Sequence, residues 1–185
     1  MLLSLIHPSE GHIEIFDQSL TSNRSAILEQ VGAVIERPDL YPYLTAQEHL
    51  TLFAKLRKQK ITAAKIEATL AQVGLLSRAN DKVQTYSLGM KQRLGIAAAL
   101  LPDPKLLMLD EPTNHLDLES ITAFNNSLSN FKGSVLFTTH DHEFAQTVGN
   151  RILELTPNGA IDRYMTFDEY LEDEKIKELR LKMYS

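Results

Sequence analysis

The sequence contains no cysteine, which excludes disulfide bonds, thiolate metal sites and cysteine nucleophiles. Its longest apolar stretch is the eight residues 94–101, far short of the ~20 residues that a membrane-spanning helix needs. Residues 1–6 are apolar but have no positive flank and no cleavage site of small residues, so we expect no signal peptide. These absences predict a cytoplasmic protein.

The composition is that of a soluble globular domain. Hydrophobic residues make up 43% of the 185 residues and charged residues 23%, a balance that supports a packed core. The 24 acidic residues outnumber the 19 basic ones, so the net charge is −5. We therefore expect no direct DNA binding, because domains that bind nucleic acid are usually basic.

Hydrophobic periodicity predicts strands that alternate with helices, and hence an α/β fold with a mostly parallel sheet. The strand-like runs are residues 12–16, 31–35, 106–109 and 134–138. The helical patterns cover residues 45–56, 62–74, 87–101 and 117–131. A hairpin over 151–155 and 160–164, turning at 157–159, and a mixed-charge helical tail from Phe167 complete the prediction.

Two adjacent carboxylates are the strongest chemical signal. Asp110 and Glu111 directly follow the apolar run 106–109, at the carboxyl end of a strand, where open α/β sheets place their ligand sites. Because side chains alternate along a strand, one carboxylate can hold Mg²⁺ while the other orients or deprotonates an attacking water. The alternative is a solvated loop after a core strand.

Two weaker features accompany this pair. Ser87 and Gly89 lead into an Ala-rich helix, whose first backbone N–H groups and positive dipole end suit a phosphate. His140 follows the run 134–138, just before a helix start. A lone histidine in such a place is more often structural than catalytic.

In this order and spacing, the motifs together resemble the nucleotide-binding domain of ABC ATPases. Residues 87–93 are similar to the signature loop, with Leu88 and Met90 in place of a usual Gly and Gln, and residues 106–110 to the Walker B strand. The resemblance implies a P-loop NTPase-like cassette with a mostly parallel sheet core. Its expected parts are a helical subdomain that contacts a membrane partner at about 45–100, a core at 101–163 and a tail at 164–185.

The resemblance also implies an ATP hydrolase that uses ATP and Mg²⁺. In this reading Glu111 activates water, His140 is the switch histidine, and Asp110 and Glu36 serve the metal. Glu36 stands where the family usually has the Q-loop glutamine, and residues 114–117 match the D-loop. The residues implied to contact the nucleotide are Glu36, Ser87, Gly89 and Asp117.

The loop Gly-x-x-x-x-Gly-Lys-Ser/Thr, which cradles phosphates in this family, does not occur, since none of the eight glycines precedes a lysine. Residues 1–6 are typical of the last turns of an apolar helix without an N-cap. We therefore expect an incomplete cassette that begins just downstream of its phosphate loop. By itself it should bind ATP weakly or not at all, whereas Ser87 and Gly89 could still complete a site on a full-length partner subunit.

The two halves resemble different branches of the family. Residues 36–46 and 86–95 are similar to bacitracin and lantibiotic resistance exporters. Residues 114–121, 131–141 and 151–155 are similar to ABC-F proteins, which are soluble translation factors that act at the ribosome. One hypothesis is a recombinant joined within residues 110–114; the alternative is a single divergent exporter ATPase that carries His115.

The function expected from this resemblance is the ATP-binding and ATP-hydrolysing subunit of a drug or antimicrobial-peptide exporter. It would lie at the inner face of the cell membrane, with a full-length second ATPase subunit and a membrane-spanning permease as partners. One alternative is an ABC-F type factor for translation or antibiotic resistance, with the ribosome as partner. Another is a non-enzymatic, degenerate partner that only lends its signature loop.

Overall fold

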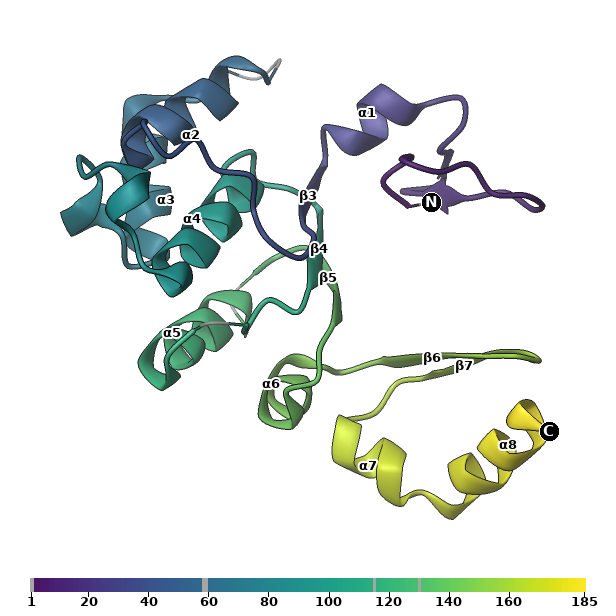
Figure 1. Cartoon of the computed structure of the whole chain (residues 1–185). Coiled ribbons are helices and arrows are strands. Elements are labelled where there is room, and N and C mark those ends of the chain that lie inside the picture. Colours follow the sequence, from purple (N-terminus) through teal and green to yellow (C-terminus); the bar gives the residue numbers. More distant parts are fainter. Residues whose placement is uncertain (1, 58–59, 115, 130) are drawn as a thin grey trace. The chain divides into compact units, whose positions relative to one another are not determined.

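Figure 1 shows the fold in a computed structural model, which describes residues 2–57, 60–114, 116–129 and 131–185. The chain divides into two compact units, Met1–Thr138 and Thr139–Ser185. Within the described ranges, no helix combines the length and the apolar character that crossing a bilayer requires.

Three parallel strands form the larger of the two sheets described in the first unit, in the order β3–β4–β5 (Figure 1). The strands are β3 (Val31–Val34), β4 (Leu106–Asp110) and β5 (Ser134–Thr138), and α5 (Leu118–Ser129) connects the last two. Val34 pairs with Leu109, and Asp110 pairs with Thr138. The carboxyl ends of the strands therefore meet at one edge of the sheet, and the expected parallel arrangement is confirmed.

Elements pack on both faces of this sheet. On one face, α4 (Leu88–Leu100) lies so close to β3 that a Cβ on Gly32 would be 2.3 Å from the carbonyl oxygen of Ala99. Because side chains alternate along a strand, Val31 points to the opposite face, where it joins a core cluster with the N-terminal elements. Those elements are β1 (Glu14–Ile15), β2 (Gln18–Ser19) and α1 (Arg24–Leu28).

The helices α2 (Ala46–Lys55), α3 (Ala63–Gln72) and α4 share a second core, and all three are at the places that the sequence predicts. The Thr45 hydroxyl accepts a hydrogen bond from the Glu48 N–H at 3.1 Å, and the Glu48 carboxylate accepts one from the Thr45 N–H at 2.8 Å. This reciprocal capping box starts α2. Gly74 follows α3 with φ of +67°, a left-handed conformation that glycine adopts easily. Two short 3₁₀ helices, η1 (Leu76–Arg78) and η2 (Val83–Thr85), lead to α4.

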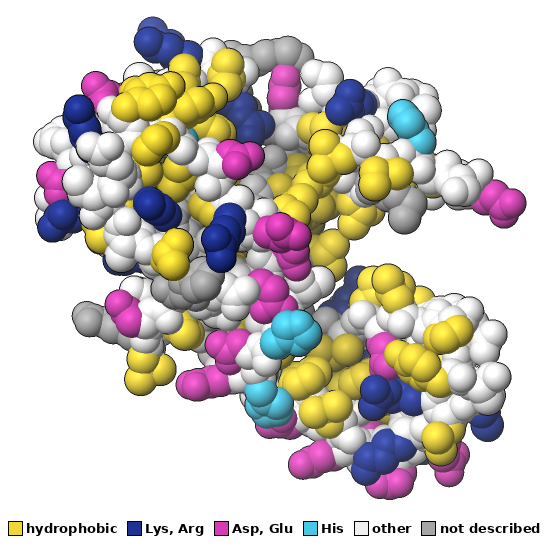
Figure 2. Space-filling view, in the orientation of Figure 1, with side chains coloured by type: hydrophobic (Ala, Val, Ile, Leu, Met, Phe, Trp, Pro, Cys, Tyr) yellow, Lys and Arg dark blue, Asp and Glu magenta, His cyan; other side chains and the backbone are white. Residues whose placement is uncertain are grey.

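Large apolar side chains remain exposed on and just before this group of helices. Tyr43 is 61% exposed and Leu56 is 75% exposed. In Figure 2, yellow side chains gather at the upper left, over the region of α2. An exposed apolar surface of this kind is typical of a contact with another protein.

A helix, a hairpin and two further helices form the second unit. The hairpin pairs Thr156 with Gly159, which places its turn where the sequence predicts it. Ile161, Tyr170 and Ile176 form a cluster of buried core residues in this unit. The elements are α6 (His142–Val148), β6 (Ile152–Thr156), β7 (Gly159–Arg163), α7 (Phe167–Glu172) and α8 (Glu174–Tyr184). The boundaries expected for the helical subdomain, the core and the tail stay predictions.

Two expectations for the N-terminal residues are wrong. Residues 2–6 form turns and bends instead of a helix, with Leu5 75% exposed and Ile6 70% exposed. A helix this short without a cap does not offset its nucleation cost. The strand expected over 12–16 is confined to Glu14–Ile15, because Phe16 and Asp17, with φ of 57° and 58°, turn the chain back into β2. The five-residue α1 was not predicted, since so short a helix shows no periodicity.

Candidate functional site

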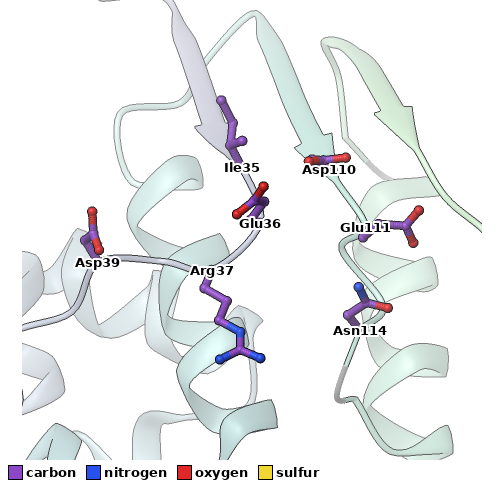
Figure 3. Close-up of a pocket in the computed structure, with 7 residues that line it drawn as sticks. All are labelled: Ile35, Glu36, Arg37, Asp39, Asp110, Glu111 and Asn114. Carbon is purple, nitrogen blue, oxygen red and sulfur yellow. The ribbon is translucent and has the colours of Figure 1, made fainter.

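The carboxyl ends of β3 and β4 border a pocket of about 550 Å³. Figure 3 shows its two sides, one formed by the segment that leaves β3 and the other by the segment that leaves β4. The structure thereby brings together three of the predicted site residues, Glu36, Asp110 and Glu111. The complete lining is Ile35, Glu36, Arg37, Asp39, Asp110, Glu111 and Asn114.

The backbone turns sharply at both strand ends. Glu36 has φ of 54° and Glu111 has φ of 46°, a left-handed conformation that costs a residue with a side chain roughly 1–2 kcal/mol. The Glu111 N–H donates a hydrogen bond to the carbonyl oxygen of Thr138 at 3.0 Å, which helps to hold this conformation. Strained backbone therefore occurs at the two glutamates that border the pocket, as is common at functional sites.

The pocket carries an excess of negative charge. Four carboxylates, from Glu36, Asp39, Asp110 and Glu111, line it beside the single guanidinium of Arg37. In Figure 3 the Arg37 side chain points away from Asp110. Such a pocket attracts a cation and repels an unaccompanied triphosphate.

Mg²⁺ fits this donor set. It is usually held by one or two carboxylates and takes its other ligands from water and substrate phosphates. Glu36 and Asp110, the predicted metal residues, both line the pocket. Among the described residues no group of three or more His, Asp or Glu side chains is arranged to hold a metal alone. A Mg²⁺ ion here would thus complete its coordination with water molecules or with substrate phosphates.

The predicted signature residues lie at the start of α4 and do not line the pocket. Ser87 is the N-cap, and its hydroxyl accepts a hydrogen bond from the Met90 N–H at 3.2 Å. Gly89 lies in the first turn. The predicted serine cap is confirmed, while phosphate binding by this helix end stays a prediction.

Asp117 caps the next helix. Its carboxylate accepts a hydrogen bond from the Ser120 N–H at 2.8 Å, at the start of α5. Hydrogen bonding with Ser120 holds the pKa of Asp117 below its usual range. Asp117 does not line the pocket, and its contact with a nucleotide stays a prediction. His115, in the predicted D-loop, lies outside the described residues.

His140 belongs to the second unit, where it precedes α6. The neighbouring Asp141 caps that helix by accepting a hydrogen bond from the Phe144 N–H at 3.0 Å. The predicted position of His140, past a strand and next to a helix start, is confirmed. Its role as a switch histidine stays a prediction.

Known proteins share both the sequence and the fold. The family model described as ABC transporter matches residues 1–114. The chain belongs to the ABC transporter family. A solved structure titled "Structure of ATP binding subunit of ABC transporter" superposes with a TM-score of 0.78 at 26% identity, over 98% of this chain and 79% of that one. The expected ABC cassette fold is therefore confirmed.

The relatives include ATP-binding proteins of transport systems. The bacitracin transport ATP-binding protein BcrA of Bacillus licheniformis is 49% identical over 117 residues, which are 63% of this chain and 38% of that protein. The uncharacterized ABC transporter ATP-binding protein YhcH of Bacillus subtilis is 37% identical over 177 residues, 94% of this chain and 58% of that protein. A second B. subtilis protein of that description, YkpA, is 51% identical over 106 residues, 57% of this chain and 20% of that protein. The chain thus spans 20–58% of the length of these relatives.

Sequence reasoning missed three residues at this pocket. Arg37 and Asp39 line it, and Thr138 contacts Asp110, whereas Asn114, which also lines it, belongs to the predicted D-loop. Arg37 and Asp39 follow the predicted site residue Glu36 within three positions. Their closeness to Glu36 in the sequence could have predicted that they lie at the same pocket. Thr138 gave no such signal, because only the pairing of β4 with β5 places it beside Asp110.

Proposed function

We propose that this chain is the ATP-binding and ATP-hydrolysing subunit of an ABC exporter for peptide antibiotics of the bacitracin or lantibiotic type. The observation that carries the proposal is the acidic pocket. Asp110 and Glu111 lie there beside Glu36, in a chain 49% identical over 117 residues to a bacitracin transport ATP-binding protein. The subunit would work at the inner face of the membrane, with a permease and a second ATPase subunit.

Within this proposal the carboxylates of the pocket divide the work. Asp110 and Glu36 would hold Mg²⁺, which would supply positive charge against the nucleotide phosphates. Glu111 follows Asp110 after a sharp backbone turn, and we assign its carboxylate a different task. That task is to orient, and accept a proton from, the water that attacks the terminal phosphate.

Phosphate contacts need a different surface, because the pocket is acidic. The N-terminus of α4 supplies it, with backbone N–H groups beyond Ser87 and Gly89 at the positive end of a 13-residue helix. We assign these residues to a nucleotide held mainly by the partner ATPase subunit. This assignment follows the resemblance of residues 87–93 to the signature loop.

The permease would contact the group of helices. The exposed Tyr43 and Leu56 give this group an apolar surface, and the resemblance implies a membrane partner for residues 45–79. An apolar surface supports contact with another protein better than contact with RNA, which calls for positive charge.

Bacitracin resistance tests the proposal. The chain is expressed in a bacitracin-sensitive bacterium together with the permease and second ATPase subunit of a bacitracin exporter, and the minimal inhibitory concentration is compared with that of the same strain without the chain. Wild type should raise it at least about fourfold, while Glu111→Gln should abolish the gain, because the variant lacks the group that activates water. Glu178→Gln, an exposed change in α8, is the matched control and should behave as wild type. An unchanged inhibitory concentration with wild type, or full resistance with Glu111→Gln, would contradict the proposal.

A second candidate is a ribosome-associated factor of the ABC-F type. It is supported by the similarity of residues 114–121, 131–141 and 151–155 to that group. The net charge of −5 does not favour RNA binding. Co-sedimentation separates the two candidates: the chain should stay in the supernatant when ribosomes are pelleted, and stoichiometric recovery with the ribosomes would favour the second.

A further inference from the structure

Thr138 lies beside the carboxylate pair as a consequence of strand register. It is the last residue of β5, and its Cα partner in the parallel ladder is Asp110. Paired residues on neighbouring strands project their side chains from the same face of a sheet. The Thr138 hydroxyl accordingly donates a hydrogen bond to Oδ1 of Asp110, at 2.5 Å.

The same residue also contacts Glu111, through its backbone. The Thr138 carbonyl oxygen accepts a hydrogen bond from the Glu111 N–H at 3.0 Å. Glu111 is in the left-handed conformation, with φ of 46°, and this bond fixes the direction in which the chain leaves β4. One residue of β5 thus contacts both Asp110 and Glu111, by its hydroxyl and by its carbonyl oxygen.

We propose that Thr138 is a positioning residue of the proposed ATP site, and the inference rests on that proposed function. Its hydroxyl orients the Asp110 carboxylate for the metal, and its carbonyl sets the turn that presents Glu111. A hydroxyl has a single proton, so it binds one carboxylate oxygen and leaves the other for a cation. A side chain held in one rotamer loses less conformational entropy when it binds a metal, which raises affinity.

Conservative substitutions separate the hydroxyl from the backbone. Thr138→Val keeps the β-branched shape and the carbonyl but removes the donor. Thr138→Ser keeps the donor and the carbonyl. Thr138 is exposed, so neither change leaves a cavity in the core. Thr156→Val in β6 is the matched control, since the Thr156 hydroxyl also donates a hydrogen bond, to the Gly159 carbonyl oxygen, in the second unit.

The experiment titrates the ¹⁵N-labelled full chain with Mn²⁺ alone and follows paramagnetic broadening of the amide signals of Asp110, Glu111 and Asn114. Wild type should show broadening centred on these amides. Thr138→Val should need about fivefold more Mn²⁺ for half-broadening, because one oriented hydrogen bond to a carboxylate is lost. Thr138→Ser and Thr156→Val should stay within about twofold of wild type. The unfolding temperature of each variant is measured alongside, and Thr138→Ala replaces the valine variant if that one does not fold.

The outcomes distinguish this inference from the proposed function. If wild type shows no broadening at these amides, the proposed metal site fails, and with it the function. If wild type shows the broadening but Thr138→Val matches it, the positioning role is overturned and the function stands. The inference is also overturned if Thr138→Ser behaves as Thr138→Val does, because the hydroxyl would then not be the group responsible.

Discussion

Two acidic regions of this chain differ in how their carboxylates are compensated. In the second unit, Glu154 accepts hydrogen bonds from the Tyr170 hydroxyl at 2.5 Å, the Tyr184 hydroxyl at 2.9 Å and Arg180 Nε at 3.1 Å. Burial by itself would raise the pKa of Glu154, but hydrogen bonds from these three residues outweigh it and lower that pKa. In the pocket of the first unit, four carboxylates have one guanidinium among the residues that line it.

The difference indicates two uses of the same chemical group. Three donors satisfy Glu154, which connects β6 to α7 and α8, so its negative charge serves the fold. The four pocket carboxylates outnumber the one guanidinium that lines the pocket with them, and a bound cation would reduce this excess of negative charge. The hydrogen-bond donors and positive charges around a carboxylate therefore distinguish a structural role from a functional one better than its residue type does.

The largest effect expected from this contrast concerns metal binding. Asp110→Ala should weaken Mn²⁺ binding more than ~20-fold, because Mg²⁺-type sites depend on one or two carboxylates. Glu154→Ala should leave it unchanged, since Glu154 already has three donors. Amide broadening by Mn²⁺ measures both. Equal weakening of Mn²⁺ binding by the two variants would contradict the distinction between a functional Asp110 and a structural Glu154.

The next effect concerns stability. Glu154→Ala should lower the free energy of unfolding by about 2–3 kcal/mol, because it leaves two hydroxyls and a guanidinium without their acceptor. Glu178→Ala, on the exposed side of the same helical tail, should change it by less than about 0.5 kcal/mol. Urea unfolding followed by circular dichroism gives the values. A loss below about 1 kcal/mol for Glu154→Ala would show that the network does not hold the tail.

Another titratable group sharpens the contrast, because it is buried without a hydrogen-bond partner in the described part of the chain. His49 in α2 is fully buried, and neither ring nitrogen has a hydrogen-bond partner among the described residues. Its ring stacks on Phe53 at 4.8 Å between centroids. Burial lowers the pKa of His49 below its ordinary 6.5.

This burial makes stability depend on pH. As the pH falls below about 6.5, the unfolded chain takes up a proton at His49 before the folded chain does. The free energy of unfolding of wild type should therefore decrease from about pH 6.5 down to the lowered pKa. In His49→Leu this decrease should be smaller, while at pH 8 the two proteins should differ little in pH dependence. Urea unfolding across this range measures the slopes, and identical slopes would disprove the role of His49.

The smallest effect is relief of repulsion within the pocket. Asp39→Asn removes one of its four carboxylates and should raise the free energy of unfolding by about 0.3–0.5 kcal/mol at low salt, because exposed like charges repel weakly. The gain should disappear at 1 M salt, where screening shortens the range of the interaction. Melting temperatures at both salt concentrations measure it. A loss of stability would mean that Asp39 has a structural partner.

Much of the fold follows from local signals. The capping box of Thr45 and Glu48, the cap by Ser87 and the turn at Gly159 all lie where the sequence predicts them, because each depends on residues a few positions apart. The prediction of a helix failed for residues 2–6, a short apolar segment that has no such signal and forms turns and bends. The candidate site was found through Asp110, Glu111 and Glu36, which belong to recognisable motifs.

By itself, the sequence determined the family, the order of the elements and the identity of the main carboxylates. Motifs, helix caps and hydrophobic periodicity each depend on residues that are close together in the sequence. Only the tertiary structure decided which residues lie together. The pairing of β3, β4 and β5 places Arg37 and Asp39 in the pocket with Asp110, and sets Thr138 against the carboxylate pair. The register between strands that lie far apart in the sequence is fixed only when their apolar faces pack together in the folded chain.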